Sequence, residues 1–388
     1  MITANFSKTK LGNWVTVIMG QSPSGESCSE DNSGVPLLNG PTEFSSRFPV
    51  PVQYTTDPKK IAKQGDLLFC VRGSTTGRMN WADQNYAIGR GVAALRHKKD
   101  IRLQPFLKGL IDNYLPILLK QATGSTFPNV SKDMLENLEI NCPELPMQMR
   151  IASIFSAYDD LIENNEKRIK NLEEMAQLLY AEWFVKFKFP GHEKVKMIDS
   201  KTEYGLIPEA LRIVKLGDKV RVFKGRNITR KTIIDGQVPV VAGGLQPAYY
   251  HNKPNANGPV ITISASGANA GFVNLYFEDI WASDCSFITE EATPFVYFYY
   301  LLLKNRQAQV TNLQKGAAQP HVYPQDVMGL SCLDIQESLL SDFECKVDSI
   351  FSEINNLKKQ QRALSKTRDL LIPQLVAGKR ELKNYGKC

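Results

Sequence analysis

The sequence predicts an α/β fold: two similar globular units of mixed α+β structure, separated by two long helices that form an antiparallel coiled coil in a pseudo-twofold arrangement. Three observations lead to this prediction. The chain has 388 residues, more than one hydrophobic core usually supports. Its motifs occur twice in the same order, and each copy ends in a long heptad pattern. We therefore expect at least two domains.

The internal repeat is visible at several anchors that keep their order along the chain. TGSTFPNV at 123–130 is answered by KGAAQPHV at 315–322, so Gly124, Pro128 and Val130 recur as Gly316, Pro320 and Val322. Three further pairs share this order: LGNWVTVIMGQS (11–22) with LGDKVRVFKGRN (216–227), GVPLLNG (34–40) with QVPVVAG (237–243), and SIFSAYDDL (153–161) with SIFSEINNL (349–357). The separations drift, which fits an old duplication with changed loops.

Each copy reads as a mixed α/β unit. β-favouring apolar runs bounded by glycines occur at 66–73 and 91–96 in the first copy, and at 259–267 and 286–289 in the second. Helical stretches are expected at 104–121 and 294–313. The Gly-x-x-x-Pro turn then connects each unit to a long helix.

The two long helices carry matching heptad seams. The first has a seam at alternating steps of four and three that is apolar with one polar interruption, Asn165: Ile151, Phe155, Tyr158, Ile162, Asn165, Ile169, Leu172, Ala176, Leu179 and Trp183. The second repeats the spacing with Phe343, Val347, Ile350, Ile354, Leu357, Gln361, Leu364, Arg368, Leu371 and Leu375. Each stripe packing on its own unit is the alternative. A helix of this length, about 60 Å, exceeds the width of a small domain, which favours the coiled coil.

The polar seam residues predict a register for antiparallel pairing. Centring the seams sets Asn165 opposite Gln361 and Arg368 opposite Tyr158. Buried amides and charges are costly unless paired, so these matches should specify the register. The alternative is that they lie at the solvated edge of the seam.

These patterns divide the chain into five segments. They are a globular unit at 1–145, a long helix at 146–188, a linker at 189–209, a second globular unit at 210–335, and a second long helix with a basic tail at 336–388. Prolines and glycines among charged residues mark the linker.

Several functional classes lack their motifs. There is no phosphate loop, no dinucleotide fingerprint and no Asn-Pro-Pro-aromatic motif, and the histidines are isolated from one another, so a catalytic or metal site is not expected. The seven cysteines contain no C-x-x-C pair and read as reduced. The longest apolar run, 295–303, is too short to cross a bilayer, and no secretory pattern opens the chain. We expect a cytoplasmic binding protein with no membrane contact.

Four stretches carry a resemblance to a known family: the turn TGSTFPNV, the helix RIASIFSAYDDLIENNEKRIKNLEEMAQLLYAEWF, the linker FPGHEKVKMIDSKTEYGLIPE and the closing LLIPQLVAGK. Together with the order unit–helix–unit–helix, they resemble the specificity subunit of type I restriction-modification systems over nearly the whole chain. One departure is PEALRIVKLGD at 208–218, where the family commonly has Pro-Glu-Gly-Trp.

The resemblance implies a DNA-recognition subunit without catalytic activity of its own. Each unit would be a target recognition domain that reads one half of a split site in double-stranded DNA, and the helices would set the spacer. Two modification subunits would bring methyltransferase chemistry with S-adenosylmethionine, and two restriction subunits would bring translocation and cleavage with ATP and Mg. The chain itself would bind no cofactor.

Residues that differ between the copies are the candidate base readers, because shared residues serve the scaffold. An arginine side chain can donate two hydrogen bonds to guanine, and an amide side chain can make a pair of hydrogen bonds with adenine. Lysine and arginine contact phosphates. The DNA-binding candidates are Gln21, Ser22, Arg72, Ser74, Thr75, Arg78, Asn80 and Asn129 in the first unit, and Lys224, Arg226, Asn227, Arg230, Ser264, Ser266, Asn269 and His321 in the second. For the basic stretch 216–231, a solvated face is the alternative.

Two other functional classes stay open at this stage. A stand-alone DNA-modifying enzyme would methylate DNA without a partner. A coiled-coil structural adaptor would give no sequence-selective protection of DNA, and it leaves the duplicated units unexplained.

Overall fold

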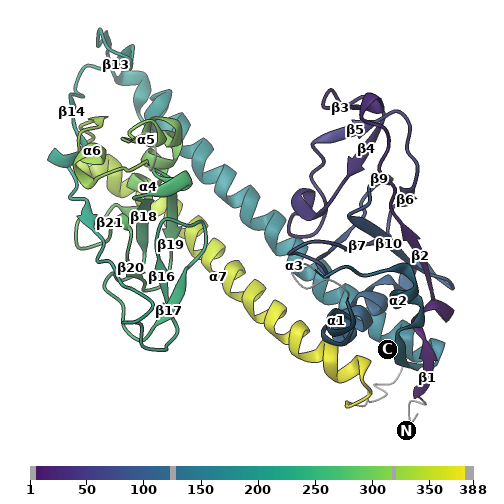
Figure 1. Ribbon diagram of the computed structural model, residues 1–388. Coiled ribbons are helices and arrows are strands. Elements are labelled where there is room, and N and C mark those ends of the chain that lie inside the picture. Colours follow the sequence, from purple (N-terminus) through teal and green to yellow (C-terminus); the bar gives the residue numbers. More distant parts are fainter. Residues whose placement is uncertain (1–5, 123–127, 317–319, 381–388) are drawn as a thin grey trace. The chain divides into compact units, whose positions relative to one another are not determined.

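The structure, a computed structural model, describes residues 6–122, 128–316 and 320–380 (Figure 1). Gly124 of the first predicted turn lies outside the described residues. The chain divides into two compact units, residues 1–164 with 361–388, and residues 165–360. Each unit therefore combines one globular domain with part of both long helices.

Two sheets build the globular domain of the first unit. The main sheet is antiparallel, in the order β2 (Val15–Met19), β10 (Val92–His97), β7 (Leu67–Cys70) and β8 (Met79–Trp81). The second sheet has the order β3 (Cys28–Ser29), β5 (Gln53–Thr55), β4 (Val35–Leu38), β9 (Tyr86–Ile88) and β6 (Ile61–Ala62). Within it β4 and β9 run parallel.

Helices cover the main sheet and connect it to the long helix. Helix α1 (Gln104–Gln121) follows β10, and its residues Phe106 and Leu110 are buried in one cluster with Phe69 of β7. The short helix α2 (Lys132–Asn137) begins where the Ser131 side chain accepts a hydrogen bond from the amide of Met134, 3.2 Å. Strands β1 (Phe6–Lys10) and β11 (Glu139–Pro143) then pair just before the long helix begins.

The globular domain of the second unit repeats this topology. Its main sheet has the order β15 (Phe223–Lys224), β21 (Cys285–Ile288), β18 (Val260–Ser264) and β19 (Val273–Tyr276). A smaller sheet contains β17 (Tyr249–His251), β16 (Val238–Val241) and β20 (Trp281–Ala282), with β16 and β20 parallel. Strands β14 (Ile213–Lys215) and β22 (Ser331–Leu333) pair as β1 and β11 do.

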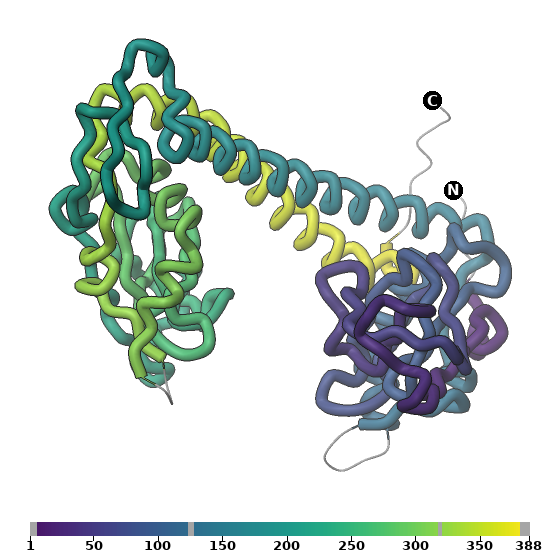
Figure 2. Tube along the Cα trace, turned by 90° about the horizontal axis from the view of Figure 1, so that it is seen from above, coloured from purple at the N-terminus to yellow at the C-terminus, as the bar shows by residue number. Residues whose placement is uncertain are grey.

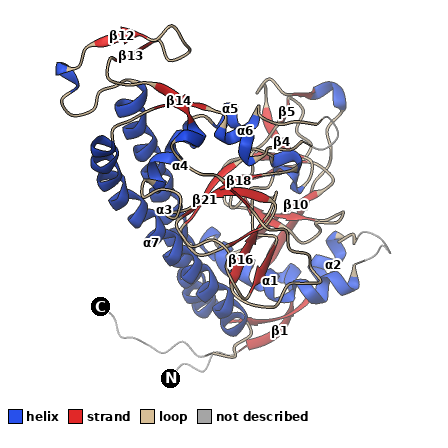
Figure 3. Ribbon diagram, turned by 90° about the vertical axis from the view of Figure 1, so that its left-hand side faces the viewer, coloured by secondary structure: helices blue, strands red, loops and turns tan. Residues whose placement is uncertain are grey.

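Three details of the second unit differ from what the sequence suggests. The predicted helix at 294–313 is divided into α4 (Val296–Asn305) and α5 (Gln307–Thr311), with α6 (Pro324–Met328) in the place of α2. The predicted linker contains a hairpin, β12 (Met197–Asp199) with β13 (Leu206–Pro208), visible in Figure 3. The first long helix ends in a π-helical turn at Ala181–Val185, which buries Trp183 and Phe184.

The long helices are α3 (Leu145–Tyr180) and α7 (Glu337–Val376), which lie side by side in Figures 2 and 3. They run antiparallel within each unit. In the first unit Phe155 and Ile372 meet at Gly109, and Asp159 pairs with Arg368. In the second unit the ring of Tyr180 lies 6.3 Å from that of Phe343, whereas Glu173 pairs with Lys358.

The predicted seams form the buried face of both helices. All twenty seam residues are buried or half-buried. The prediction of mixed α/β units with antiparallel paired helices is therefore confirmed.

Candidate nucleic-acid interface

In the first unit, five segments meet at the same end of the main sheet. The loop after β2 is held to the β9–β10 loop: the Gln21 amide donates to the carbonyl of Ile88 at 2.8 Å, and the Arg90 amide donates to the Ser22 hydroxyl at 3.3 Å. The loop after β7 joins them, because the Val71 amide donates to the carbonyl of Gly91 at 2.9 Å.

Two further segments complete this end. The amide of Val130 donates to the carbonyl of Val71 at 2.9 Å, so the described part of the repeated turn, with Asn129 bridged to Arg72, lies beside the β7–β8 loop. The loop after β4 is attached through the Gly89 amide, which donates to the carbonyl of Leu38 at 2.8 Å.

The second unit builds the same framework with different side chains. The Arg226 amide donates to the carbonyl of Ala282 at 2.9 Å, as that of Gln21 does to Ile88. The Ala265 amide donates to the carbonyl of Asp284 at 3.1 Å, and the Val322 amide donates to the carbonyl of Ala265 at 2.9 Å. Ser266 and His321 form the bridge that Arg72 and Asn129 form in the first unit.

Glycines at matching places explain how these loops approach one another. A Cβ on Gly20 would lie 2.1 Å from the carbonyl oxygen of Gly89, and one on Gly225 would lie 2.1 Å from that of Ser283. Only glycine permits this approach. The β7–β8 loop likewise has two glycines at positive φ, Gly73 and Gly77. The β18–β19 loop has two at the matching places, Gly267 and Gly271. The shared residues are scaffold, as the repeat suggests.

The predicted readers of the first unit fall into two groups. Gln21, Arg72, Ser74, Thr75 and Asn129 are exposed on the converging loops, and Ser22 is half-buried there.

Arg78 and Asn80 instead hold the segment 41–45. The guanidinium of Arg78 donates to the carbonyls of Pro41 at 3.1 Å and Phe44 at 2.5 Å. Asn80 is only 3% exposed, and its amide donates to the carbonyl of Ser45 at 3.0 Å. The Asn80 side chain is therefore not displayed at the surface.

The predicted readers of the second unit divide similarly. Lys224, Arg226, Asn227 and Arg230 are exposed. The hydroxyl of Ser264, a buried residue, donates to the carbonyl of Gly243 at 3.2 Å, and the amide of Asn269 donates to the same carbonyl at 3.3 Å. Ser266 donates to the carboxylate of Asp284, and the ring of His321 stacks on that of Tyr323.

Three residues at these ends are missing from the sequence-based candidates: Asn39, Arg90 and Asp284. Asn39 could have been found, because the aligned anchors LLNG and VVAG differ there. Arg90 and Asp284 lie in loops of unequal length that connect matching strands, where the repeat gives no alignment. A carboxylate such as that of Asp284 can accept from the amino group of cytosine.

The residues predicted to set the register between α3 and α7 lie as follows in the structure. Asn165 is 5% exposed and Gln361 is half-buried; their predicted pairing stays a prediction. Arg368, expected opposite Tyr158, donates to the carboxylate of the next residue, Asp159, at 2.7 Å.

Neither a metal cluster nor a membrane-spanning helix is found in the described part of the chain. Over residues 6–122, 128–316 and 320–380, no group of three or more His, Cys, Asp and Glu side chains is placed to hold a metal ion. Within the same ranges, no helix combines the length and apolar character needed to cross a bilayer.

Comparisons with known proteins agree with this architecture. Residues 4–174 match the family described as type I restriction modification DNA specificity domain. The putative type I restriction enzyme MjaX specificity subunit of Methanocaldococcus jannaschii is 34% identical over 175 residues, which are 45% of this chain and 41% of that protein. The MjaIX specificity subunit of the same organism is 28% identical over 306 residues, 70% and 69% of the two chains.

Two further matches cover nearly the whole chain. The MjaVIII specificity subunit from that organism is 22% identical, over 99% of this chain and 95% of its own. The crystal structure of the S subunit of a type I restriction-modification system from M. genitalium superposes with a TM-score of 0.62 at 16% identity, covering 99% of this chain and 98% of that one. At this identity the likeness concerns the fold. Residues 4–174 thus match the type I restriction modification DNA specificity domain family, and the chain as a whole is similar to type I specificity subunits.

Proposed function

We propose that each globular domain reads one half of a split site in double-stranded DNA, while α3 and α7 set the spacer between the halves. The observation that carries this proposal is the pair of equivalent loop ends: one hydrogen-bonded framework occurs in both units but displays different side chains. A shared framework with varied side chains suits two readers of different sequences.

The chemistry of the displayed side chains supports DNA as the ligand. The first loop end presents Arg72, Arg90 and the amide of Gln21, and the second presents Arg226. Arginine and amide side chains make the paired hydrogen bonds that distinguish guanine and adenine in the major groove. The exposed lysine and arginines near β15, Lys224, Arg230 and Arg221, suit phosphate contacts, which fix position without reading sequence.

The proposal assigns the remaining chemistry to partner subunits, all acting on DNA in the cytoplasm. Two modification subunits would bring the methyltransferase reaction and S-adenosylmethionine, and two restriction subunits would bring ATP, Mg and cleavage. One feature of the long helices supports two copies of a partner. Leu178 and Leu370 occupy equivalent places in the repeat, and each is 64% exposed, whereas their neighbours Leu179 and Leu371 pack inward.

The proposed function is tested by reconstituting the chain with its modification subunit and mapping methylated adenines across a genome. The map should show two half-sites at one fixed separation. Exchanging residues 1–145 for the equivalent unit of a relative should change one half-site and leave the other half-site and the spacer unchanged. A change in both half-sites, or methylation without sequence preference, would contradict the two-reader proposal.

A further inference from the structure

One surface segment of the first unit connects the candidate reading loops to the long helices. It comprises residues 41–47, between β4 and β5, and we name it the strut. Strand β8 and Arg78, the residue before it, hold the strut: Arg78 and Asn80 donate to its carbonyls at Phe44 and Ser45, and the amide of Trp81 donates to the carbonyl of Arg47 at 2.9 Å. The strut is therefore attached to the strand that follows the β7–β8 loop.

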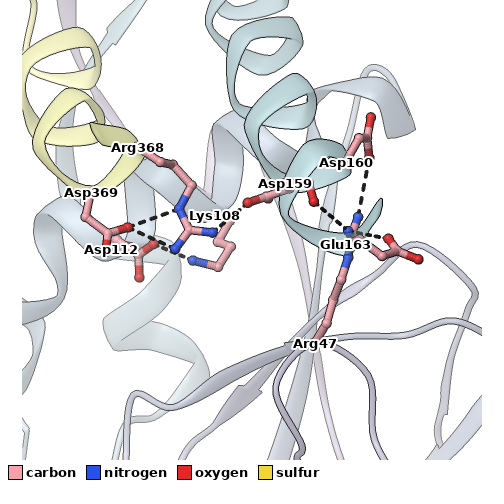
Figure 4. A network of polar contacts seen from close by, with 8 residues as sticks. All are labelled: Arg47, Lys108, Asp112, Asp159, Asp160, Glu163, Arg368 and Asp369. Carbon is pink, nitrogen blue, oxygen red and sulfur yellow. Dashed lines mark hydrogen bonds and ion pairs between the residues drawn. The ribbon is translucent and has the colours of Figure 1, made fainter. Parts of the chain in front are cut away.

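Arg47, the last residue of the strut, contacts helix α3 through its side chain. The Arg47 guanidinium donates to the backbone carbonyl of Asp159 at 3.1 Å, lies 3.6 Å from the carboxylate of Asp160 and pairs with Glu163 (Figure 4). Its side chain is 27% exposed, so the contacts are partly shielded from water. Because Asp159 also pairs with Arg368 of α7, the contacts run from β8 to both helices.

The second unit has no segment of this length at the equivalent place. Residues 39–52 connect β4 to β5, whereas only residues 242–248 connect β16 to β17. The second unit is joined to α7 differently: the carboxylate of Glu344 accepts hydrogen bonds from the amides of Tyr297 and Phe298, at 2.8 and 2.9 Å, where α4 begins. The strut is a feature of the first unit.

We infer that Arg47 is a specificity-determining residue for the spacer: it fixes the angle at which the first reading surface is carried on α3, and it does not read bases. This inference rests on the proposed function. DNA turns once in about 10.5 base pairs, so each added base pair rotates a half-site by about 34°. A reading domain that could tilt on its helix would tolerate the neighbouring rotations. A guanidinium held by three groups on one helical turn restricts that tilt.

Removing the Arg47 charge should leave the fold intact. Arg47 lines a groove of about 310 Å³ together with Phe48, Trp81, Pro105 and Ser156 among others, so it is not part of a closed core. Of the strut, Phe44 belongs to a buried hydrophobic cluster of this unit, whereas neither Arg47 nor the adjacent Phe48 belongs to either of its two clusters. A substitution at Arg47 therefore removes the link to α3 without opening a cavity.

The test uses the full chain reconstituted with its modification subunit and S-adenosylmethionine. The substrates are DNA duplexes that carry both half-sites at the cognate spacer or at one base pair more or less. The variant is Arg47→Gln. The matched control is Lys59→Gln, which also removes one positive charge from the same domain, but whose ion pair is with Asp57, outside α3. Glu163→Gln weakens the same link from the helix side, and the double exchange Arg47→Glu with Glu163→Arg offers a rescue.

We expect Arg47→Gln to reduce the preference for the cognate spacer over its neighbours by about tenfold, which corresponds to about 1.4 kcal/mol. Glu163→Gln should act in the same direction, Lys59→Gln should not, and the double exchange should restore preference. Both half-site sequences should stay unchanged. An unaltered spacer preference in folded Arg47→Gln and Glu163→Gln would overturn the inference, as would a changed half-site. Absence of site-selective methylation by the wild-type complex would instead overturn the proposed function.

Discussion

Arg368 of α7 donates to the carboxylate of Asp159 on α3 at 2.7 Å, and the backbone carbonyl of the same Asp159 accepts from Arg47. The Asp159 side chain is 17% exposed, so its charge is largely withdrawn from water. Its two partners come from α7 and from the strut. Asp159 thus joins both helices and the globular domain within the first unit (Figure 4).

We predict that Arg368→Ala destabilises the first unit by about 1–3 kcal/mol, because it leaves a partly buried carboxylate without its cation. The comparison variant is Arg168→Ala. Arg168 makes an ion pair of the same length, 2.7 Å, with Glu353, but both side chains are about half exposed. Its loss should cost less than about 1 kcal/mol. Urea unfolding followed by circular dichroism measures both; equal losses would show that burial does not strengthen the Asp159 pair.

Glu344 predicts a pH dependence of stability in the second unit. Burial, together with the nearby Asp348 and Glu290, raises the pKa of Glu344 from 4.5 to about 7, against the two backbone amides that favour its charged form. The folded state therefore holds a proton that the unfolded state releases near pH 4.5. Stability from this group is fully present below about pH 4.5 and is lost as the pH rises through about 7, by at most about 3 kcal/mol.

The matching substitution is Glu344→Gln, which does not titrate; its single oxygen keeps an acceptor for one of the Tyr297 and Phe298 amides, and its NH2 group faces the other. Thermal midpoints between pH 5 and 8 should fall with rising pH in the wild type and stay level in this variant, apart from the contribution of other groups. Glu174→Gln, at an exposed glutamate of α3, is the control and should keep the wild-type slope. A slope unchanged by Glu344→Gln would refute the assignment.

The paired glycines at the two loop ends give a prediction about half-site independence. Gly20→Ala and Gly225→Ala should each force the backbone apart, since a Cβ would lie 2.1 Å from a carbonyl oxygen. We expect a loss of at least about 2 kcal/mol in the affected unit. Each should also weaken recognition of its own half-site by displacing Gln21 or Arg226. Gly25→Ala, where a Cβ meets nothing within 4 Å, should change neither unfolding nor recognition.

The sequence predicts the long helices well because heptad periodicity is a local signal. The same holds for the strands at 66–73 and 259–267, which are apolar runs between glycines, and for the loop framework to the extent that its anchors repeat. Which side chains are displayed does not follow from the repeat. Asn80 looks like a reader because it lies near Arg78, yet alternation along the three-residue strand β8 turns it inward.

Contacts between residues that are far apart in the sequence could not be predicted, for a different reason. Arg47 and Asp159 are 112 residues apart, and no spacing rule connects a loop residue with a helix residue at such a separation. The strut also has no counterpart in the second unit, so the repeat could not reveal it. Asn39 is different: the aligned anchors contain it, and the rule that differing residues select bases would have nominated it.

Helix length should set the spacer if α3 and α7 act as a ruler. Deleting residues 166–172 together with 354–360 removes one heptad from each helix and keeps both seams in phase. Each helix shortens by about 10 Å, which is close to the rise of three base pairs. Methylation of a spacer library should therefore move to a different spacer length. Undiminished methylation at the original spacer would mean that helix length is not the measure.

The exposed leucines of the long helices predict how many partner copies bind. Leu178→Lys should remove one of two equivalent apolar contacts and Leu370→Lys the other. Each single variant should bind one modification subunit at wild-type strength and the second about tenfold to a hundredfold more weakly, since burying a leucine contributes about 1.5–3 kcal/mol.

Native mass spectrometry of the complexes measures this stoichiometry directly. The control is Leu161→Lys: Leu161 is 50% exposed on α3, but its counterpart in the repeat, Leu357, is buried, so this position offers no pair of equivalent contacts. The double variant Leu178→Lys with Leu370→Lys should bind neither copy at concentrations that saturate the wild type. If the single variants lose both copies together, the two sites are not independent, because equivalent and separate contacts require that one survive the loss of the other.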